Sequence, residues 1–152
     1  MTLQVFTWRE GLLARVGHDL RLSAPARITR EGEAVVVTVD AASLHVDGAM
    51  KDGRLTEVSA GDRADIEKAL RTDVLNVARH PQIRWRGTMD GRGTLELCGR
   101  SAPLRVPAKA EGDRMRGEVE FAPSAWGIKP FRALLGALKL QDRVRVVFDG
   151  SV

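Results

Sequence analysis

Hydrophobic and polar residues alternate with a period of two along most of this chain. Such alternation is typical of β-strands that have one face buried and the other exposed to water. Short glycine-containing segments, such as REGE, DGRG and AEGD, separate the alternating runs and predict tight turns. The pattern therefore predicts an antiparallel β-meander. The apolar positions of the runs are Leu12, Ala14, Val16, Val35, Val37, Val39, Leu95, Leu97, Leu104, Val106, Val119, Phe121, Val144, Val146 and Phe148.

Residues 62–79 have helical rather than strand periodicity. Asp62 is the predicted N-cap of this helix, since aspartate commonly accepts a hydrogen bond from a backbone N–H of the first turn. Pro81 predicts the end of the helix, because proline cannot continue it. The apolar positions that recur at helical spacing are Ile66, Leu70, Val74 and Val77.

A second departure from the strand pattern is the apolar segment PFRALLGALKL at residues 130–140. Its apolar residues are too closely spaced for an exposed loop. We predict a short turn of helix or an apolar flap that leads into the last strand.

The pattern predicts about eight strands and one helical excursion. A sheet of these strands has two outer strands with unpaired edges unless it closes on itself. Closing the sheet into a barrel removes unpaired edges. The interior of an eight-stranded barrel is either filled by side chains or left as one ligand cavity. We therefore predict an all-β fold, an eight-stranded antiparallel β-barrel with a helical excursion around residues 62–79, as a single domain over residues 1–152.

Neither a membrane-spanning segment nor an export signal is predicted. The longest apolar stretches, AVVV and ALLGAL, are far shorter than the roughly 20 residues that span a bilayer. The first ten residues, MTLQVFTWRE, lack a basic region followed by an apolar one, so we expect a cytoplasmic protein. The single Cys98 excludes an intramolecular disulfide, and its place in the alternating TLELC predicts a structural strand residue rather than a nucleophile.

The net charge of +4 is distributed unevenly. Residues 1–80 hold 11 basic and 12 acidic side chains, whereas residues 81–152 hold 13 and 8. Most of the basic residues are arginines, which suit phosphate or carboxylate binding. They are scattered at strand spacing and form no dense cluster, so nucleic-acid binding is not the expected function.

The segment QIRWRG places Trp85 between Arg84 and Arg86. A nucleic-acid stacking surface would need the aromatic and basic side chains on one exposed face. Successive strand residues point to opposite faces, so Trp85 shares its face with Ile83 and not with its arginine neighbours. Trp85 is therefore predicted to point inward, into either a packed core or a ligand cavity.

Four segments, in this order and spacing, carry a family resemblance. They are ARVGHDLRLSAPARI at 14–28, DIEKALRTDVLNVARHPQIRWRG at 65–87, GTLELCGRSAPLRVP at 93–107 and SAWGIKPFRALLGALKLQDRVRVVFD at 124–149. Together they resemble the YceI-like family of lipocalin-like polyisoprenoid-binding proteins. The resemblance implies a lipocalin-like barrel that holds a polyisoprenoid, an isoprenoid quinone or another long-chain lipid. It also implies a binding protein that is not an enzyme, has no cofactor besides its lipid, and forms a homodimer.

The predicted cavity lining combines apolar residues of the strands and of the 130–140 segment. Composition alone would favour a packed core for such a set, whereas the resemblance favours a cavity. A filled barrel that acts as a protein-interaction or anion-binding module is the alternative. The lining residues are Val37, Ile83, Trp85, Leu97, Val119, Phe121, Trp126, Phe131, Leu134 and Val146.

Three residues are candidates for contact with a lipid head group. Lys129 and Arg132 border the predicted flap, where a cation would meet a charged head group. The resemblance places His18 at the family's recurrent histidine, where it either contacts a head group or bonds to buried backbone. His45 and His80 have no metal-ligand spacing, so no metal site and no catalytic residue are predicted.

Overall fold

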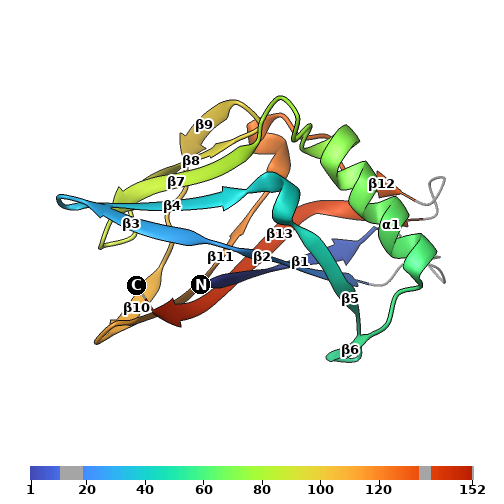
Figure 1. Ribbon diagram of the computed structural model, residues 1–152, viewed down its shortest axis with the longest axis horizontal. Coiled ribbons are helices and arrows are strands. Elements are labelled where there is room, and N and C mark those ends of the chain that lie inside the picture. Colours follow the sequence, from blue (N-terminus) through green and yellow to red (C-terminus); the bar gives the residue numbers. More distant parts are fainter. Residues whose placement is uncertain (11–18, 134–137, 152) are drawn as a thin grey trace.

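Two antiparallel sheets, with one helix at their end, make up the computed structural model, which describes residues 1–10, 19–133 and 138–151 (Figure 1). The strands of the larger sheet are β1 (Thr2–Arg9), β2 (Asp19–Pro25), β5 (His45–Lys51), β6 (Arg54–Thr56), β10 (Ala108–Glu111), β11 (Arg114–Phe121), β12 (Arg132–Ala133) and β13 (Leu138–Ser151). These eight strands follow the order β10-β11-β13-β1-β2-β5-β6, and β12 pairs with β13.

The smaller sheet has five strands in the order of their appearance along the chain. They are β3 (Arg27–Glu31), β4 (Ala34–Asp40), β7 (Gln82–Thr88), β8 (Gly93–Leu97) and β9 (Arg100–Pro103). A 3-10 turn, η1 (Ala41–Ser43), returns the chain from β4 to the larger sheet at β5. A second, η3 (Pro123–Trp126), follows β11.

The all-β antiparallel prediction is confirmed, but the prediction of one closed barrel of eight strands is wrong. The pairing within the described residues forms two sheets, because the ladder is interrupted where the chain passes between them. At Ala26, between β2 and β3, the N–H donates to the Met1 carbonyl at 2.7 Å. Between β9 and β10, Pro107 has no N–H to donate to a ladder.

The predicted inward faces are confirmed for four strands, whereas Leu104 and Val106, predicted in a strand, lie between β9 and β10 and still line the cavity. The alternating apolar residues of β4, β8, β11 and β13 all face the space between the two sheets. Leu12, Ala14 and Val16 lie outside the described residues. The strand periodicity therefore identified the inner face of these four strands, although it did not identify the division into two sheets.

The predicted helix is present as α1 (Ala60–Ala69), which continues into a π-helical turn, η2 (Leu70–Val74). It ends before the predicted residue 79: Asn76 has a φ of 45°, which a helix does not continue through, so Val77 lies in a turn and not on the helix. Its N-cap is Ser59 rather than the predicted Asp62: the Ser59 Oγ accepts a hydrogen bond from the Asp62 N–H at 3.1 Å. Asp62 lies in the first turn, where its negative charge interacts favourably with the helix dipole. Both residue types are good caps, so the sequence alone did not decide between them.

The flanks of the apolar 130–140 segment are strands rather than a turn of helix. Arg132 pairs with Lys139 and Ala133 with Leu138, so β12 folds back on the start of β13. The centre of the predicted flap, which includes Leu134, lies outside the described residues.

Cys98 lies in the turn between β8 and β9 and not in a strand as predicted. Cys98 and Gly99 have φ values of 51° and 74°, as a two-residue hairpin turn of type I′ requires. The thiol makes weak contacts with the carbonyls of Val74 and Leu75 at 3.8 and 3.6 Å, and burial raises its pKa. A thiol with a raised pKa is a poor nucleophile at neutral pH, which agrees with a structural role.

Candidate functional site

A cavity of about 280 Å³ lies between the two sheets. Aliphatic and aromatic side chains from both sheets form most of its walls. Thr7 is one of the few polar residues that line it, and the Thr7 hydroxyl accepts a hydrogen bond from the Leu20 N–H at 3.2 Å. Such a surface can take an apolar ligand out of water but offers few partners to a polar one.

Most of the predicted lining residues face this cavity. Trp126 does not, and Leu134 lies outside the described residues. The predicted residues that line the cavity are Val37, Ile83, Trp85, Leu97, Val119, Phe121, Phe131 and Val146.

Trp85 points into the cavity, and its arginine neighbours point away from it. Burial alternates strictly along β7, with Ile83 and Trp85 half-buried and Arg84 and Arg86 exposed. The indole N–H of Trp85 donates to the Leu104 carbonyl at 2.9 Å, so the polar atom of the ring is satisfied by the wall. The aromatic and basic groups therefore do not form one stacking surface.

Trp126 is part of the core beside the cavity. Its side chain is buried, with 3% of the residue exposed, and its indole N–H donates to the Leu95 carbonyl at 2.8 Å. The ring packs edge-on against Phe121, with centroids 5.1 Å apart and planes inclined by 68°. The indole thus ties η3 to β8 and β11 rather than facing a ligand.

The helix lies at one end of the cavity. Ile66, Leu70, Val74 and Leu75, from α1, η2 and the residue after them, line the cavity, and Figure 1 shows α1 at the end of the two sheets. Sequence reasoning recognised the apolar helical face but did not assign it to the site. The signal was the apolar spacing itself, since such a face on a lone helix must pack against the sheets.

Lys129 is the head-group candidate that the structure places at the cavity. It is exposed and contributes to the lining together with Asp142 and Arg143. The Asp142 carboxylate accepts from the backbone N–H of Ser124 at 2.9 Å. The Arg143 guanidinium donates to Glu120 and stacks on the ring of Trp8, with its central carbon 3.7 Å from the ring centroid.

The other two head-group candidates are not on the described wall. Arg132 is exposed on β12 and is absent from the described cavity lining. His18 lies outside the described residues.

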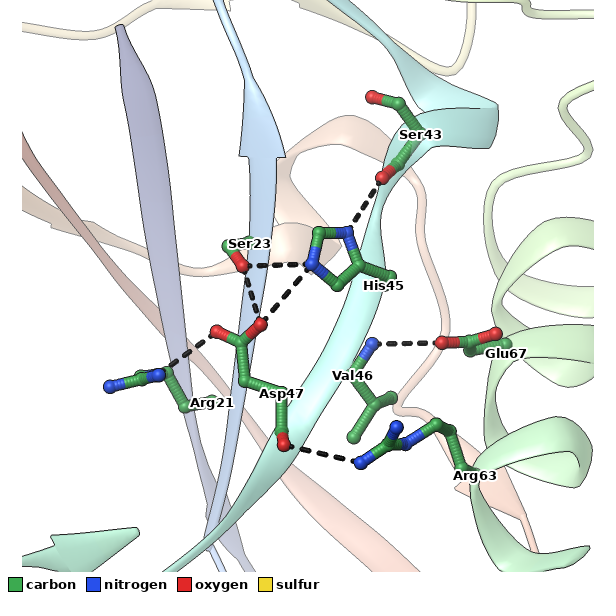
Figure 2. A network of polar contacts seen from close by, with 8 residues as sticks. All are labelled: Arg21, Ser23, Ser43, His45, Val46, Asp47, Arg63 and Glu67. Atoms are coloured by element: carbon green, nitrogen blue, oxygen red, sulfur yellow. Dashed lines mark hydrogen bonds and ion pairs between the residues drawn. The ribbon is translucent and has the colours of Figure 1, made fainter. Parts of the chain in front are cut away.

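Figure 2 shows a network of polar contacts on the outer face of β2 and β5. The Ser23 hydroxyl donates to Asp47 Oδ1 at 2.6 Å, and Arg21 Nε donates to Asp47 Oδ2 at 2.9 Å. His45 Nε2 lies 3.2 Å from both the Ser23 oxygen and the Asp47 carboxylate, and its Nδ1 lies 3.2 Å from the Ser43 carbonyl. In a Ser–His–Asp triad the carboxylate holds the nitrogen that does not face the serine, so this arrangement is not a triad.

The same network attaches α1 to β5. The backbone N–H of Val46 donates to Glu67 Oε1 at 3.0 Å, and Arg63 Nη2 donates to the Asp47 carbonyl at 3.3 Å (Figure 2). The ladder between β2 and β5 shifts register at this point, between Arg21 and Leu22. Side chains of the helix therefore satisfy backbone groups of β5 and fix the helix at the end of the cavity.

On the outer faces of the sheets, exposed arginines form ion pairs with carboxylates of the same chain. A hydrogen bond and the positive charge of Arg86 hold the pKa of Glu31 below its usual range. Arg114 donates two hydrogen bonds to Asp149, at 2.7 and 2.8 Å, and lowers the pKa of that carboxyl in the same way. Carboxylates of the chain itself thus neutralise these arginines, which weighs against an anion-binding outer surface.

Among residues 1–10, 19–133 and 138–151, no three His, Cys, Asp or Glu side chains form a group that could hold a metal ion. Within the same ranges, no helix is long and apolar enough to cross a membrane. The cytoplasmic location stays a prediction.

Comparison with known proteins gives one family match over nearly the whole chain. A family model described as the YceI-like domain matches residues 2–152. No curated protein matches the sequence.

Two solved structures have a similar fold. BcnA from Burkholderia cenocepacia aligns with a TM-score of 0.59 and 14% identity, over 97% of this chain and 93% of that chain. A polyisoprenoid-binding domain from Saccharophagus degradans, implicated in plant cell wall breakdown, aligns with a TM-score of 0.60 and 14% identity, over 97% and 90%. At this identity the likeness shows the fold alone.

Proposed function

Because this chain belongs to the YceI-like family, we propose that it binds one long apolar lipid in the cavity between its two sheets. The cavity carries this proposal: its walls are apolar, and the indole N–H of Trp85 is already bonded to Leu104. Burial of each CH₂ group of a ligand contributes about 0.8 kcal/mol, so a long hydrocarbon chain binds tightly without specific polar contacts.

The ligand that fits best is a polyisoprenoid or an isoprenoid quinone. The similar domain from Saccharophagus degradans is described as polyisoprenoid-binding, which supports this choice. We infer a carrier or sensor, formed by residues 1–152 as one domain, rather than an enzyme. The homodimer implied by family resemblance stays a prediction.

The test is organic extraction of the protein purified from its native host, followed by mass spectrometry. We expect a stoichiometric isoprenoid or other long-chain lipid in the extract. Titration of the delipidated protein with farnesol should change its tryptophan fluorescence, and Trp85→Phe should remove most of that change, since Trp8 and Trp126 do not line the described cavity. An empty extract together with an unresponsive titration would leave the filled interaction module as the better explanation.

Lys129, which lines the cavity, and Arg132 of β12, which lies outside the described lining, are proposed to favour an anionic head group of the lipid. Neutralising both residues, as Lys129→Gln with Arg132→Gln, should weaken farnesyl diphosphate about tenfold, because each exposed charge interaction contributes up to about 1 kcal/mol. Farnesol should bind the double variant as it binds the parent. Calorimetric titration of both ligands checks this, and equal affinities of the parent and the double variant for the diphosphate would remove these residues from the head-group site.

A further inference from the structure

The ring of Trp85 lies over a pair of glycines in the wall of the cavity. Gly87 of β7 and Gly93 of β8 are directly paired across the ladder. A Cβ atom added at Gly87 would come within 2.5 Å of Trp85 Cζ2, and one added at Gly93 within 2.5 Å of Trp85 Cε2. The indole therefore occupies the space that two side chains would otherwise take, and its hydrogen bond to Leu104 holds it there.

The opposite wall has the same arrangement. Phe148 of β13 pairs with Gly117 of β11, and a Cβ atom at Gly117 would lie 2.6 Å from Phe148 Cζ. Both sites adjoin the segment 104–107: Leu104 donates its N–H to the Gly93 carbonyl at 3.0 Å, and Pro107 contacts the position of a Gly117 side chain. The two rings thus lie in the same region of the cavity, one along each sheet.

This region is remote from the helix. Along β7 the ring of Trp85 reaches toward the turn that joins β7 to β8, which Figure 1 places at the opposite end of the sheets from α1. Beyond the ring, Thr88 and Met89 continue the lining on this sheet. An indole that projected across the cavity would block the way to them, whereas one seated on glycines leaves it open.

We propose that Trp85, seated on the Gly87–Gly93 pair, sets the bore of the cavity at this end and thereby the length of the lipid chain that it accepts. This inference rests on the proposed function. A short prenyl chain fills the part of the cavity near α1, and a longer one must pass the indole. Each further CH₂ group of the lipid that is buried beyond the indole raises the affinity for the lipid about fourfold. The width of the cavity at Trp85 therefore determines whether a longer lipid chain binds more tightly.

The test compares geraniol, farnesol and geranylgeraniol by calorimetric titration of the parent and of Gly93→Ala. The added methyl group drives the indole away from the wall and into the bore. We expect at least tenfold weaker binding of geranylgeraniol and less than a twofold change for geraniol. Gly61→Ala is the matched control, since a Cβ atom at Gly61 meets no other atom within 4 Å, and it should leave all three affinities unchanged.

A second pair of variants distinguishes an effect on binding that acts through the indole from one that acts through distortion of the strands. The methyl group of Gly93→Ala would also lie 2.7 Å from the Arg86 carbonyl, which alone could distort the strands. If the indole is the cause, Gly93→Ala made in a Trp85→Leu background no longer discriminates against geranylgeraniol. If the discrimination persists without the indole, the inference is overturned.

A variant that fails to fold does not end the test. Should Gly93→Ala lose its cooperative unfolding transition, Val35→Phe replaces it, because Val35 pairs with Gly87 and lines the same part of the cavity. It should weaken geranylgeraniol selectively, as expected for Gly93→Ala. Equal weakening of all three alcohols overturns the inference alone, whereas a parent that binds none of them overturns the proposed function as well.

Discussion

Val37→Glu is expected to weaken lipid binding at least a hundredfold. Val37 lies in β4, pairs with Trp85 and faces the cavity. A carboxylate there would stand among apolar side chains, and a bound hydrocarbon chain would remove the water that solvates it. Taking an unpaired charge out of water costs several kcal/mol of binding free energy, which is more than burial of one CH₂ group of the ligand contributes. Calorimetric titration with geranylgeraniol measures the loss directly.

The neighbouring residue provides the matched control. Thr38 lies on the other face of β4, where its register partners are Arg27 of β3 and Arg84 of β7. Thr38→Glu adds the same charge between two arginines and outside the cavity, so it should leave lipid affinity within about twofold of the parent. A folded Val37→Glu protein that still binds geranylgeraniol at parental affinity would show that the chain does not lie along β4.

Trp126→Ala is expected to reduce the free energy of unfolding by about 3–5 kcal/mol, as removal of a large buried aromatic side chain does. The substitution removes the edge-on contact with Phe121 and leaves the Leu95 carbonyl without its indole donor. For a chain of this size the loss corresponds to a fall in Tm of more than about 6 °C. Denaturant unfolding gives the free energy, and calorimetry gives the Tm.

A less buried tryptophan outside the described cavity lining provides the comparison for Trp126→Ala. Trp8 is half-buried and covered on one side by the Arg143 guanidinium. Trp8→Ala should cost less than half as much as Trp126→Ala, because the ring is partly in water already and the lost cation–π contact contributes about 1 kcal/mol. If the two substitutions cost the same, Trp126 does not make the core contacts described above.

Strand periodicity was the most informative signal in the sequence. Val35, Val37 and Val39 all line the cavity, because side chains two residues apart along a strand share a face whatever sheet the strand joins. The same signal carries no information on pairing. The break at Ala26 and the passage over residues 104–107 depend on which backbone groups find partners, so the division into two sheets was not predictable.

Two tryptophans show which side-chain orientations at the site are predictable from the sequence and which are not. Trp85 was predicted to point inward from the strand pattern of QIRWRG, and the structure agrees. Trp126 follows a strand, in a 3-10 turn that ends at Gly127 with φ of 77°, and no periodicity determines the direction of a side chain in such a turn. That the Trp85 ring turns back over Gly87 and Gly93 follows from packing across two strands, which the sequence does not show.

The attachment of α1 to β5 also bears on how copies of this protein meet. An unpaired strand edge is a site where a strand of another molecule can add, and proteins protect such edges with charged side chains or with a helix. β6 pairs with Ala49–Lys51 of β5. The Glu67 side chain accepts a hydrogen bond from the Val46 N–H, and the Arg63 side chain donates one to the Asp47 carbonyl. This part of β5 is therefore closed to edge-to-edge addition, so aggregation or dimer formation by strand exchange would have to begin elsewhere on the molecule.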